Sequence, residues 1–328
     1  MIEKPIRSAV FVSCTRNGRA RVLTRLAVSA AFGIASGFLC SLLMRRMGLG
    51  AADFGNALVE AREWLAGRDP FAIYHGATSY PLPATIFALP LLRLAPETAA
   101  GVFFGFSSAC LAFGLSCSGN WRLLAFLAYP YWAAMITVQW VPLLMAAAFL
   151  PWLFAAAAAK PQVAAPLFLC YPSWRGAIAT GAVLLASLVM MPNWPLRWLP
   201  GVCGFQHFVP LLALPGPALL LVLYCRRDPD SHLLLLSSLS SQHWFYDSFV
   251  LWLIPKNRQE MLATILLSWG AGITRWYFIP HSWDEVGSWA VLWIYVPMLG
   301  VILLRRFQPA TAPAHPHALR QAAAAINA

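Results

Sequence analysis

The chain has 328 residues, of which 60% are hydrophobic and 11% are charged, and its mean hydropathy is +0.65. Soluble globular proteins carry about 25% charged residues, so this composition excludes an ordinary aqueous enzyme. Polar segments are at most about 40 residues long, too short for a separate aqueous domain. The net charge of +11 then reports membrane topology, and no nucleic-acid partner is expected.

The N-terminal segment, residues 1–25, is basic and precedes the first apolar run, residues 26–44. This run is longer than the core of a signal peptide, and no small-x-small cleavage site follows it. The sequence therefore predicts an uncleaved first helix with a cytoplasmic N-terminus, in a multi-pass protein of the inner (plasma) membrane.

The longest polar segment, residues 45–80, is predicted to be the first outer loop. Its apolar residues recur at helical spacing after Asp53, which predicts an amphipathic helix that lies on the outer membrane face and ends near Gly67. The residues on this pattern are Phe54, Leu58, Val59, Arg62 and Leu65. Asp53 itself fits two roles, an N-cap of this helix or a functional carboxylate.

Ten further apolar runs follow, many of them short and broken by proline, which is typical of helices buried in a bundle or lining a cavity. They are residues 81–94, 98–117, 123–138, 141–159, 161–171, 177–191, 208–225, 232–254, 261–278 and 286–304. The fold class predicted is all-α, a polytopic transmembrane helix bundle of about 10–12 spans or half-spans. The integral domain covers residues 26–304, and residues 305–328 form a disordered cytoplasmic tail.

The positions of the flanking cationic turns indicate whether residues 232–254 form a single span or a hairpin. A single span there would place the cationic turns at 226–227 and 256–258 on opposite sides of the membrane. A hairpin that turns back within residues 237–247 keeps both turns inside. It also places Gln242, His243, Tyr246 and Asp247 on the same outer side as Asp53.

Ionisable groups at membrane depth are functional candidates by default, and four are present. Asp53 opens the outer loop, Lys160 interrupts an alanine-rich run, and His243 and Asp247 lie in the hairpin. Lys160 either extends to an interface or faces a cavity. His243 and Asp247, four residues apart, either form a structural pair or contribute to a site.

Three other features have simpler interpretations. The tryptophan- and proline-rich residues 192–207 are expected to form an interfacial loop that only anchors the bundle. Asp228 and Asp230 spell a DxD motif, but they lie in a short turn where Asp and Pro are ordinary. The seven cysteines form no CxxC pair, so neither a disulfide nor a metal site is expected.

A series of motifs resembles the DUF2029 proteins of glycosyltransferase family 87, the polyprenyl-phosphate-mannose-dependent mannosyltransferases. The series is Asp53, GRDPFAIY at 67–74, YPLPATIFALPL at 80–91 and AAAAAKPQVAAPL at 155–167. Two motifs depart from the family. It usually has Tyr-Pro-Pro where this chain has Tyr80, Pro81, Leu82 and Pro83, and Gly-Gln-x-Asn where it has Val138, Gln139, Trp140 and Val141. The helix count moreover places Gln139 nearer the inner side.

The resemblance implies a GT-C fold, a reaction on the outer membrane face and a lipid-phosphate-linked sugar donor. Asp53 would be the general base, and the acceptor would be a lipid or a glycan. Lys160, His243, Arg62 and Arg68 are the cations available to the donor phosphate, and Tyr80, Gln162 and Asp247 would complete the binding site. For Arg68, a surface pair with Asp69 or Glu63 is the alternative, and such pairs contribute little to stability. No cofactor is implied, and a role for a divalent ion stays open.

Two other classes stay open. One is a transporter or flippase that binds the same polyprenyl-linked sugar without cleaving it. The other is a noncatalytic membrane assembly subunit, which would bind no donor.

Overall fold

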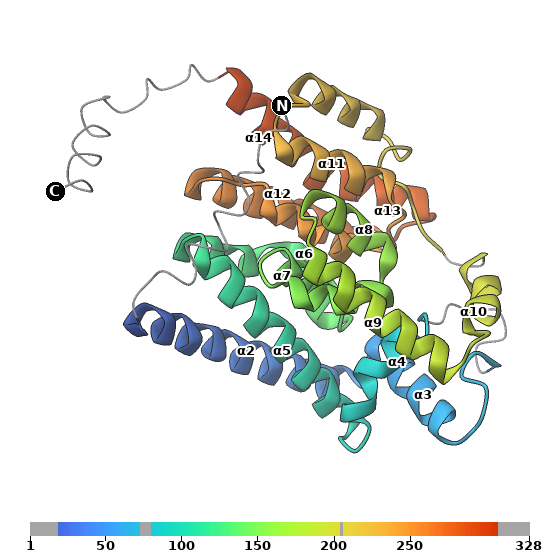
Figure 1. Cartoon of the computed structure of the whole chain (residues 1–328). Helices are drawn as coiled ribbons and strands as arrows, with labels where there is room; N and C mark the ends of the chain where they lie inside the picture. The colour runs from blue at the N-terminus through green and yellow to red at the C-terminus, as the bar shows by residue number, and fades with distance from the viewer. Residues whose placement is uncertain (1–18, 73–79, 204–205, 308–328) are drawn as a thin grey trace.

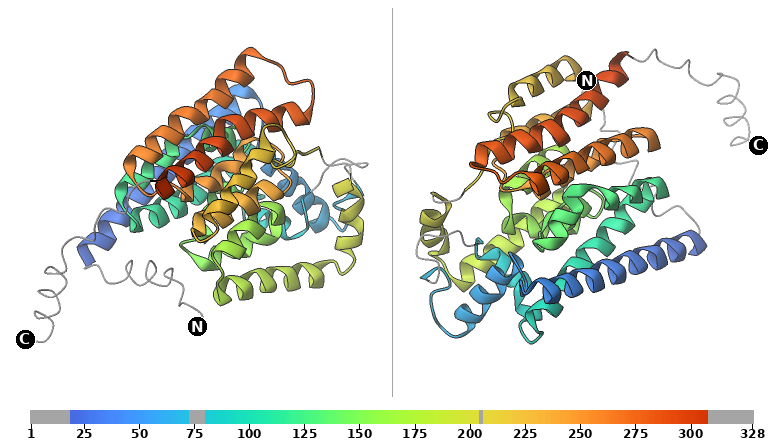
Figure 2. Two further views of the ribbon diagram at one scale, coloured as in Figure 1. Left: turned by 90° about the horizontal axis from the view of Figure 1, so that it is seen from above. Right: turned by 180° about the vertical axis from the view of Figure 1, so that it is seen from behind.

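The computed structural model describes residues 19–72, 80–203 and 206–307. This part of the chain is 77% helical and contains no strand, which confirms the all-α prediction. Its one isolated β-bridge joins Phe208 to Gln242. The helices form one bundle, in which segments far apart in sequence lie side by side (Figures 1 and 2).

The helices are, in chain order, α2 (Arg19–Met47), α3 (Phe54–Leu65), α4 (Pro83–Ala88), η2 (Leu89–Leu91), α5 (Pro96–Cys117), η3 (Asn120–Leu127), α6 (Tyr129–Ile136), α7 (Val141–Ala147), η4 (Pro151–Ala159), α8 (Pro161–Cys170), α9 (Trp174–Met190), α10 (Trp194–Cys203), η5 (Gly216–Cys225), α11 (Pro229–Leu239), η6 (Phe245–Leu253), α12 (Arg258–Tyr277), α13 (Trp283–Ala290), η7 (Val291–Tyr295) and α14 (Val296–Phe307).

Three helices are long and apolar enough to cross a membrane, namely Val22–Met47, Pro96–Cys117 and Trp283–Arg306. A fourth span is possible if α9 and α10, which meet at a bend of 104°, are taken together. Several other predicted spans are divided into short pieces. Proline near the start of α6, α7, η4 and α8 explains these breaks, because proline lacks the amide that would continue the preceding helix.

Helices α2 and α5 lie side by side along most of their length (Figure 1). Glycines allow their backbones to touch: a Cβ added to Gly37 would lie 2.6 Å from the Gly101 carbonyl oxygen. Small residues of this kind are typical of helix contacts in membranes. The close packing of these two helices fixes the start of the following loop, which carries Asp53.

Helix α3 occupies the range in which the sequence predicts an amphipathic helix. Phe54 is fully buried and stacks on Phe103 with a ring-centroid distance of 4.1 Å, which anchors the start of the helix. Leu65, expected on the apolar face, is 61% exposed, whereas Glu60 is fully buried. Its buried face is thus rotated from the prediction, because α3 packs against protein, including α4 and α5.

The predicted turn within residues 237–247 is confirmed. Helix α11 ends at Leu239 and η6 begins at Phe245, so the chain turns back between them. We name this end of the bundle the Asp53 end. Residues 226–230, 254–260 and 305 lie together at the opposite end, which we name the Arg305 end, because α11 and η6 connect the two.

Two predicted boundaries and one expectation about the cysteines need correction. Helix α2 begins at Arg19, so the last part of the predicted N-terminal segment is already helical, and α14 continues to Phe307 beyond the predicted boundary at 304. The rest of both terminal segments lies outside the described residues. Cys117 is in a disulfide, contrary to expectation, because the lack of a CxxC pair does not exclude other pairings of cysteines.

Candidate functional site

A cavity of about 310 Å³ opens at the Asp53 end of the bundle. Segments far apart in sequence contribute to it: the loop before α3 and the start of α3, the residues just before α4, the η4–α8 junction, α10, and the turn before η6 with the start of η6. Its lining residues are Asp53, Asn56, Tyr80, Pro81, Ala159, Lys160, Pro161, Gln162, Trp198, Val202, Ser241, His243 and Tyr246. Five of the eight residues singled out from the sequence are thus gathered around one space.

The Asp53 carboxylate does not cap helix α3. Asp53 has helical backbone angles (φ −63°, ψ −32°) and its side chain makes no capping hydrogen bond, so the N-cap interpretation is wrong. Instead, Asp53 Oδ2 accepts hydrogen bonds from Gln139 Nε2 and, at 3.5 Å, from the Tyr246 hydroxyl. The carboxylate therefore points into the bundle, where it can meet a bound molecule.

Gln139 connects Asp53 to Lys160. Its amide nitrogen donates to Asp53, while its Oε1 accepts a hydrogen bond of 2.7 Å from Lys160 Nζ. The side chain is fully buried. A carboxylate can only accept and an ammonium can only donate, so the two neighbours fix the orientation of the amide. The three side chains form one connected polar chain.

Lys160 is the buried cation of the site. It is 4% exposed, so the interpretation that it extends to an interface is wrong. Its Nζ lies 2.7 Å from Asp247 Oδ1 and 4.5 Å from the centre of the Tyr246 ring. The residue lies at the junction of η4 and α8, where Pro161 starts a new helix. This break turns the side chain of Lys160 toward the cavity.

His243 lies beside the cavity in the turn between α11 and η6. Its Nδ1 lies 2.7 Å from the Gln206 carbonyl oxygen, and its ring stacks on Trp283 with a centroid distance of 4.8 Å. Asp247 receives the backbone amide of His243 at 2.9 Å and the ammonium of Lys160. Asp247 thus holds the turn and the cation together.

Burial is the largest influence on the pKa of the Asp53 carboxyl. Burial raises its pKa above the ordinary value of 3.8, while the charges of Lys160 and His243 and the hydrogen bond from Tyr246 act in the opposite direction. A carboxylate of raised pKa that borders a cavity is a candidate general base, because its affinity for a proton is increased.

Two of the cations suggested by the sequence lie elsewhere. Arg62 is exposed on α3 and does not line the cavity. Arg68 forms a bidentate pair with Glu63 on the surface. Neither side chain is among the residues that line the cavity next to Asp53.

Sequence reasoning also missed parts of the site. The helix count placed Gln139 near the inner side, but α6 ends at Ile136 and the following turn brings Gln139 to Asp53. The amide of Asp53 donates to the Thr137 carbonyl oxygen at 3.2 Å, which fixes this turn. Residues 192–207, expected only to anchor the bundle, supply Trp198 and Val202 to the cavity wall.

The DxD motif lies at the opposite end of the bundle. Asp228 caps helix α11 through the amide of Asp230, and both carboxylates pair with Lys256 and Arg305. The interpretation as an ordinary turn is confirmed. Within residues 19–72, 80–203 and 206–307, no group of three or more His, Cys, Asp or Glu side chains is arranged to hold a metal.

Comparisons with protein-family models, with curated proteins and with solved structures found no match to this chain. The class that the fold supports is a helical membrane protein. Any more specific function has to be argued from the cavity itself.

Proposed function

We propose that the protein is a membrane glycosyltransferase that moves a hexose from a polyprenyl-phosphate-sugar donor to a lipid or glycan acceptor. The observation that carries the proposal is that Asp53 and Lys160 line one cavity and are joined by the buried Gln139. It combines a carboxylate that can accept a proton with a cation that can bind a phosphate. Mannose as the sugar, and a GT-C fold, rest on the resemblance of the motifs to family 87.

The reaction is a single displacement. The acceptor hydroxyl attacks the anomeric carbon of the sugar, the bond between that carbon and the phosphate oxygen breaks, and Asp53 takes the hydroxyl proton. The electron pair of the broken bond leaves with the polyprenyl phosphate. A positioned general base contributes about 10²- to 10⁴-fold to such a rate.

Lys160 is the principal candidate for stabilising the leaving phosphate. An ammonium has three N–H donors, and Gln139 accepts a hydrogen bond from one of them, while Asp247 forms an ion pair with the ammonium. A bound anionic oxygen can accept a further hydrogen bond from the same group. In a site shielded from water a fixed cation stabilises developing negative charge more strongly than in solution. His243 and Gln162, which line the same cavity, complete the donor site.

The membrane explains the absence of an aqueous nucleotide domain in such an enzyme. A polyprenyl carrier is dissolved in the bilayer, so the protein needs only a polar cavity that the carrier reaches from the lipid. We place the Asp53 end on the outer face of the inner membrane, with the Arg305 end in the cytoplasm. The arginines of the turn at 226–227 and of the end of α14 agree with this orientation under the positive-inside rule.

The main alternative is a transporter or flippase for the same carrier. The buried ion pair of Lys160 and Asp247 favours it, because paired charges at membrane depth are also found in proton relays. A noncatalytic assembly subunit would bind no donor.

Purified full-length protein, incubated with labelled polyprenyl-phosphate-mannose and a lipid acceptor extract, tests the three functions. An enzyme releases polyprenyl phosphate and labels the acceptor. A transporter binds the donor and leaves it intact. If neither binding nor cleavage is detected with mannose or glucose donors, the proposal is wrong.

A further inference from the structure

The Arg305 end of the bundle has a second and larger hollow, of about 690 Å³. It lies between the end of η5, the turn before α11 and the end of α14. Its lining residues are Leu223, Tyr224, Cys225, Arg226, Arg227, Asp228, Ile302, Arg305 and Arg306. Four arginines and one aspartate face the same space, so the hollow attracts anions.

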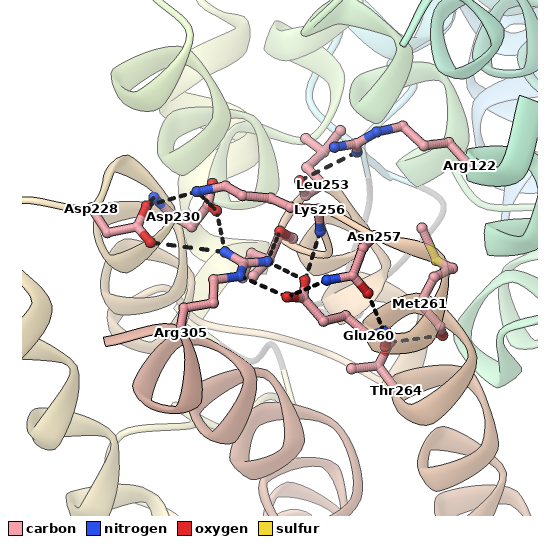
Figure 3. Close-up of polar contacts among 11 residues, drawn as sticks. Arg122, Asp228, Asp230, Leu253, Lys256, Asn257, Glu260, Met261, Thr264 and Arg305 are labelled. Atoms are coloured by element: carbon pink, nitrogen blue, oxygen red, sulfur yellow. Dashed lines mark hydrogen bonds and ion pairs between the residues drawn. The ribbon is translucent and has the colours of Figure 1, made fainter. Parts of the chain in front are cut away.

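The four arginines differ in their partners. Figure 3 shows Arg305 between Asp230 and Glu260. Its guanidinium lies 2.8 Å from Asp230 and 2.5 Å from Glu260, and it donates to the Ile254 carbonyl oxygen at 2.7 Å. Lys256 completes this network by pairing with Asp228 and Asp230. Arg305 is therefore a structural cation whose charge is compensated within the protein.

Arg226, Arg227 and Arg306 are exposed, and none of them forms an ion pair with a carboxylate in the described residues. Asp228, the one carboxylate of the hollow, is engaged by Lys256 and Arg305. The hollow thus presents three uncompensated guanidinium groups. Guanidinium groups bind phosphate oxygens through paired hydrogen bonds.

An apolar hollow of about 540 Å³ continues from the basic one along η5. The two share Leu223 and Tyr224, and the rest of the second hollow is lined by Pro217, Ala218, Leu220 and Leu221. Leu220, Leu221 and Leu223 are 46–49% exposed, and Tyr224 is 70% exposed. A basic site and an apolar channel therefore adjoin each other on one surface.

We propose that this double hollow binds an anionic membrane phospholipid, with its phosphate at Arg226, Arg227 and Arg306 and an acyl chain along η5. Charge complementarity identifies the head group as anionic, and the adjoining apolar hollow identifies the ligand as an amphiphile rather than a free anion. Basic pockets at the cytoplasmic ends of membrane helices bind anionic lipids in this manner. The site is remote from Asp53 and is independent of the proposed transfer reaction.

The test is thermal unfolding of the delipidated full-length protein in neutral detergent, with phosphatidylglycerol or phosphatidylcholine added. A ligand that binds only the folded state raises the unfolding temperature, and the rise grows with the ratio of ligand concentration to Kd. We expect stabilisation by phosphatidylglycerol at concentrations where phosphatidylcholine has little effect. The double variant Arg226→Gln/Arg306→Gln should weaken this binding by about 30-fold, at roughly fivefold for each arginine.

Arg175→Gln/Arg258→Gln is the matched control. These two exposed arginines, at the starts of α9 and α12, are outside the hollow, and their replacement removes the same charge. The control should respond to phosphatidylglycerol like the unmodified protein. A separate variant, Ala218→Trp, fills the apolar hollow and should weaken the lipid while leaving the arginines intact.

Three results would overturn the proposal. One is equal stabilisation by both lipids, and another is unchanged binding in the Arg226→Gln/Arg306→Gln variant. The third is equal stabilisation by inorganic phosphate, which would identify the hollow as a site for a free anion. A dimer of the delipidated protein that only the Arg226→Gln/Arg306→Gln variant abolishes would assign the surface to a second copy and would also contradict the lipid.

Discussion

Lys160 Nζ lies 2.7 Å from Asp247 Oδ1, and both side chains are almost completely buried. Removal of one member of such a pair leaves an uncompensated charge, which destabilises a protein by roughly 3–5 kcal/mol. Lys160→Met should therefore lower the free energy of unfolding by about that amount. The double variant Lys160→Met/Asp247→Leu should recover most of the loss, because both charges are gone. Chemical unfolding in detergent measures these differences, and an additive double variant would contradict the pairing.

Donor binding separates the buried cation from the surface cations. A hydrogen bond to a charged group contributes about 1.5–3 kcal/mol, so loss of the Lys160 contact should weaken donor affinity by about 10- to 100-fold. The stable double variant Lys160→Met/Asp247→Leu is the form in which to measure it. Arg68→Ala should leave the affinity unchanged, because Arg68 pairs with Glu63 on the surface. An equal loss of donor affinity in Lys160→Met/Asp247→Leu and in Arg68→Ala would show that the phosphate lies outside the cavity.

Gln139 is predicted to position Asp53 rather than to bind substrate. Gln139→Leu keeps the approximate size of the side chain and removes both of its hydrogen bonds, to Asp53 and to Lys160. The value of kcat should fall by about tenfold or more, because the base is no longer held in place, while KM changes little. Steady-state kinetics decide this. A change confined to KM would instead assign Gln139 to donor binding.

Activity should decline in acid because Asp53 has to be ionised to accept a proton. Burial raises its pKa, so the acid limb of the pH profile should lie above the ordinary value of 3.8. The Tyr246 hydroxyl hydrogen-bonds to the carboxylate and lowers its pKa. Tyr246→Phe should therefore move the acid limb to higher pH. Ser241→Ala changes the same cavity wall without touching Asp53 and should leave the acid limb in place. If the acid limb is the same in the unmodified protein, in Tyr246→Phe and in Ser241→Ala, Asp53 is not the titrating base.

Glu60 should make stability depend on pH. It is fully buried, and burial raises its pKa well above 4.5 despite hydrogen bonds from the Tyr80 amide and Thr85. Between the unfolded and folded pKa values the native state holds more protons, so stability is highest below 4.5 and falls as the pH rises through the folded pKa. Glu60→Gln should reduce the pH dependence of the unfolding free energy, which is measured by unfolding at several pH values. Glu63→Gln, on the exposed side of the same helix, should leave this dependence unchanged. If Glu60→Gln also leaves it unchanged, Glu60 is not the titrating group.

The sequence identified the chemistry of the site better than its architecture. Asp53, Lys160 and His243 were found because ionisable groups are rare in apolar chains, and this rarity does not depend on knowing the fold. Gln139 was predicted at the wrong end of the bundle, because the end at which a residue lies depends on how many helices precede it. The periodicity of an apolar run does not show where a proline will divide it, as at α6 and α7.

Arg62 and Arg68 show that a charged residue in the right loop need not reach the site. Both belong to the predicted outer loop, and their charge made them candidate phosphate ligands beside Lys160. Neither lines the cavity, because Arg62 lies on the exposed side of α3 and Arg68 pairs with Glu63. These are properties of packing, which a list of charged residues does not contain.

Release of polyprenyl phosphate by the Asp53→Asn variant, compared with the unmodified protein at equal donor saturation, tests the central claim most directly. Asparagine keeps the shape of the side chain and cannot take up the acceptor proton. We expect the variant to fold and to bind labelled donor, but to release polyprenyl phosphate at least about 10²-fold more slowly. Turnover at the unmodified rate would contradict the role of Asp53 as the base.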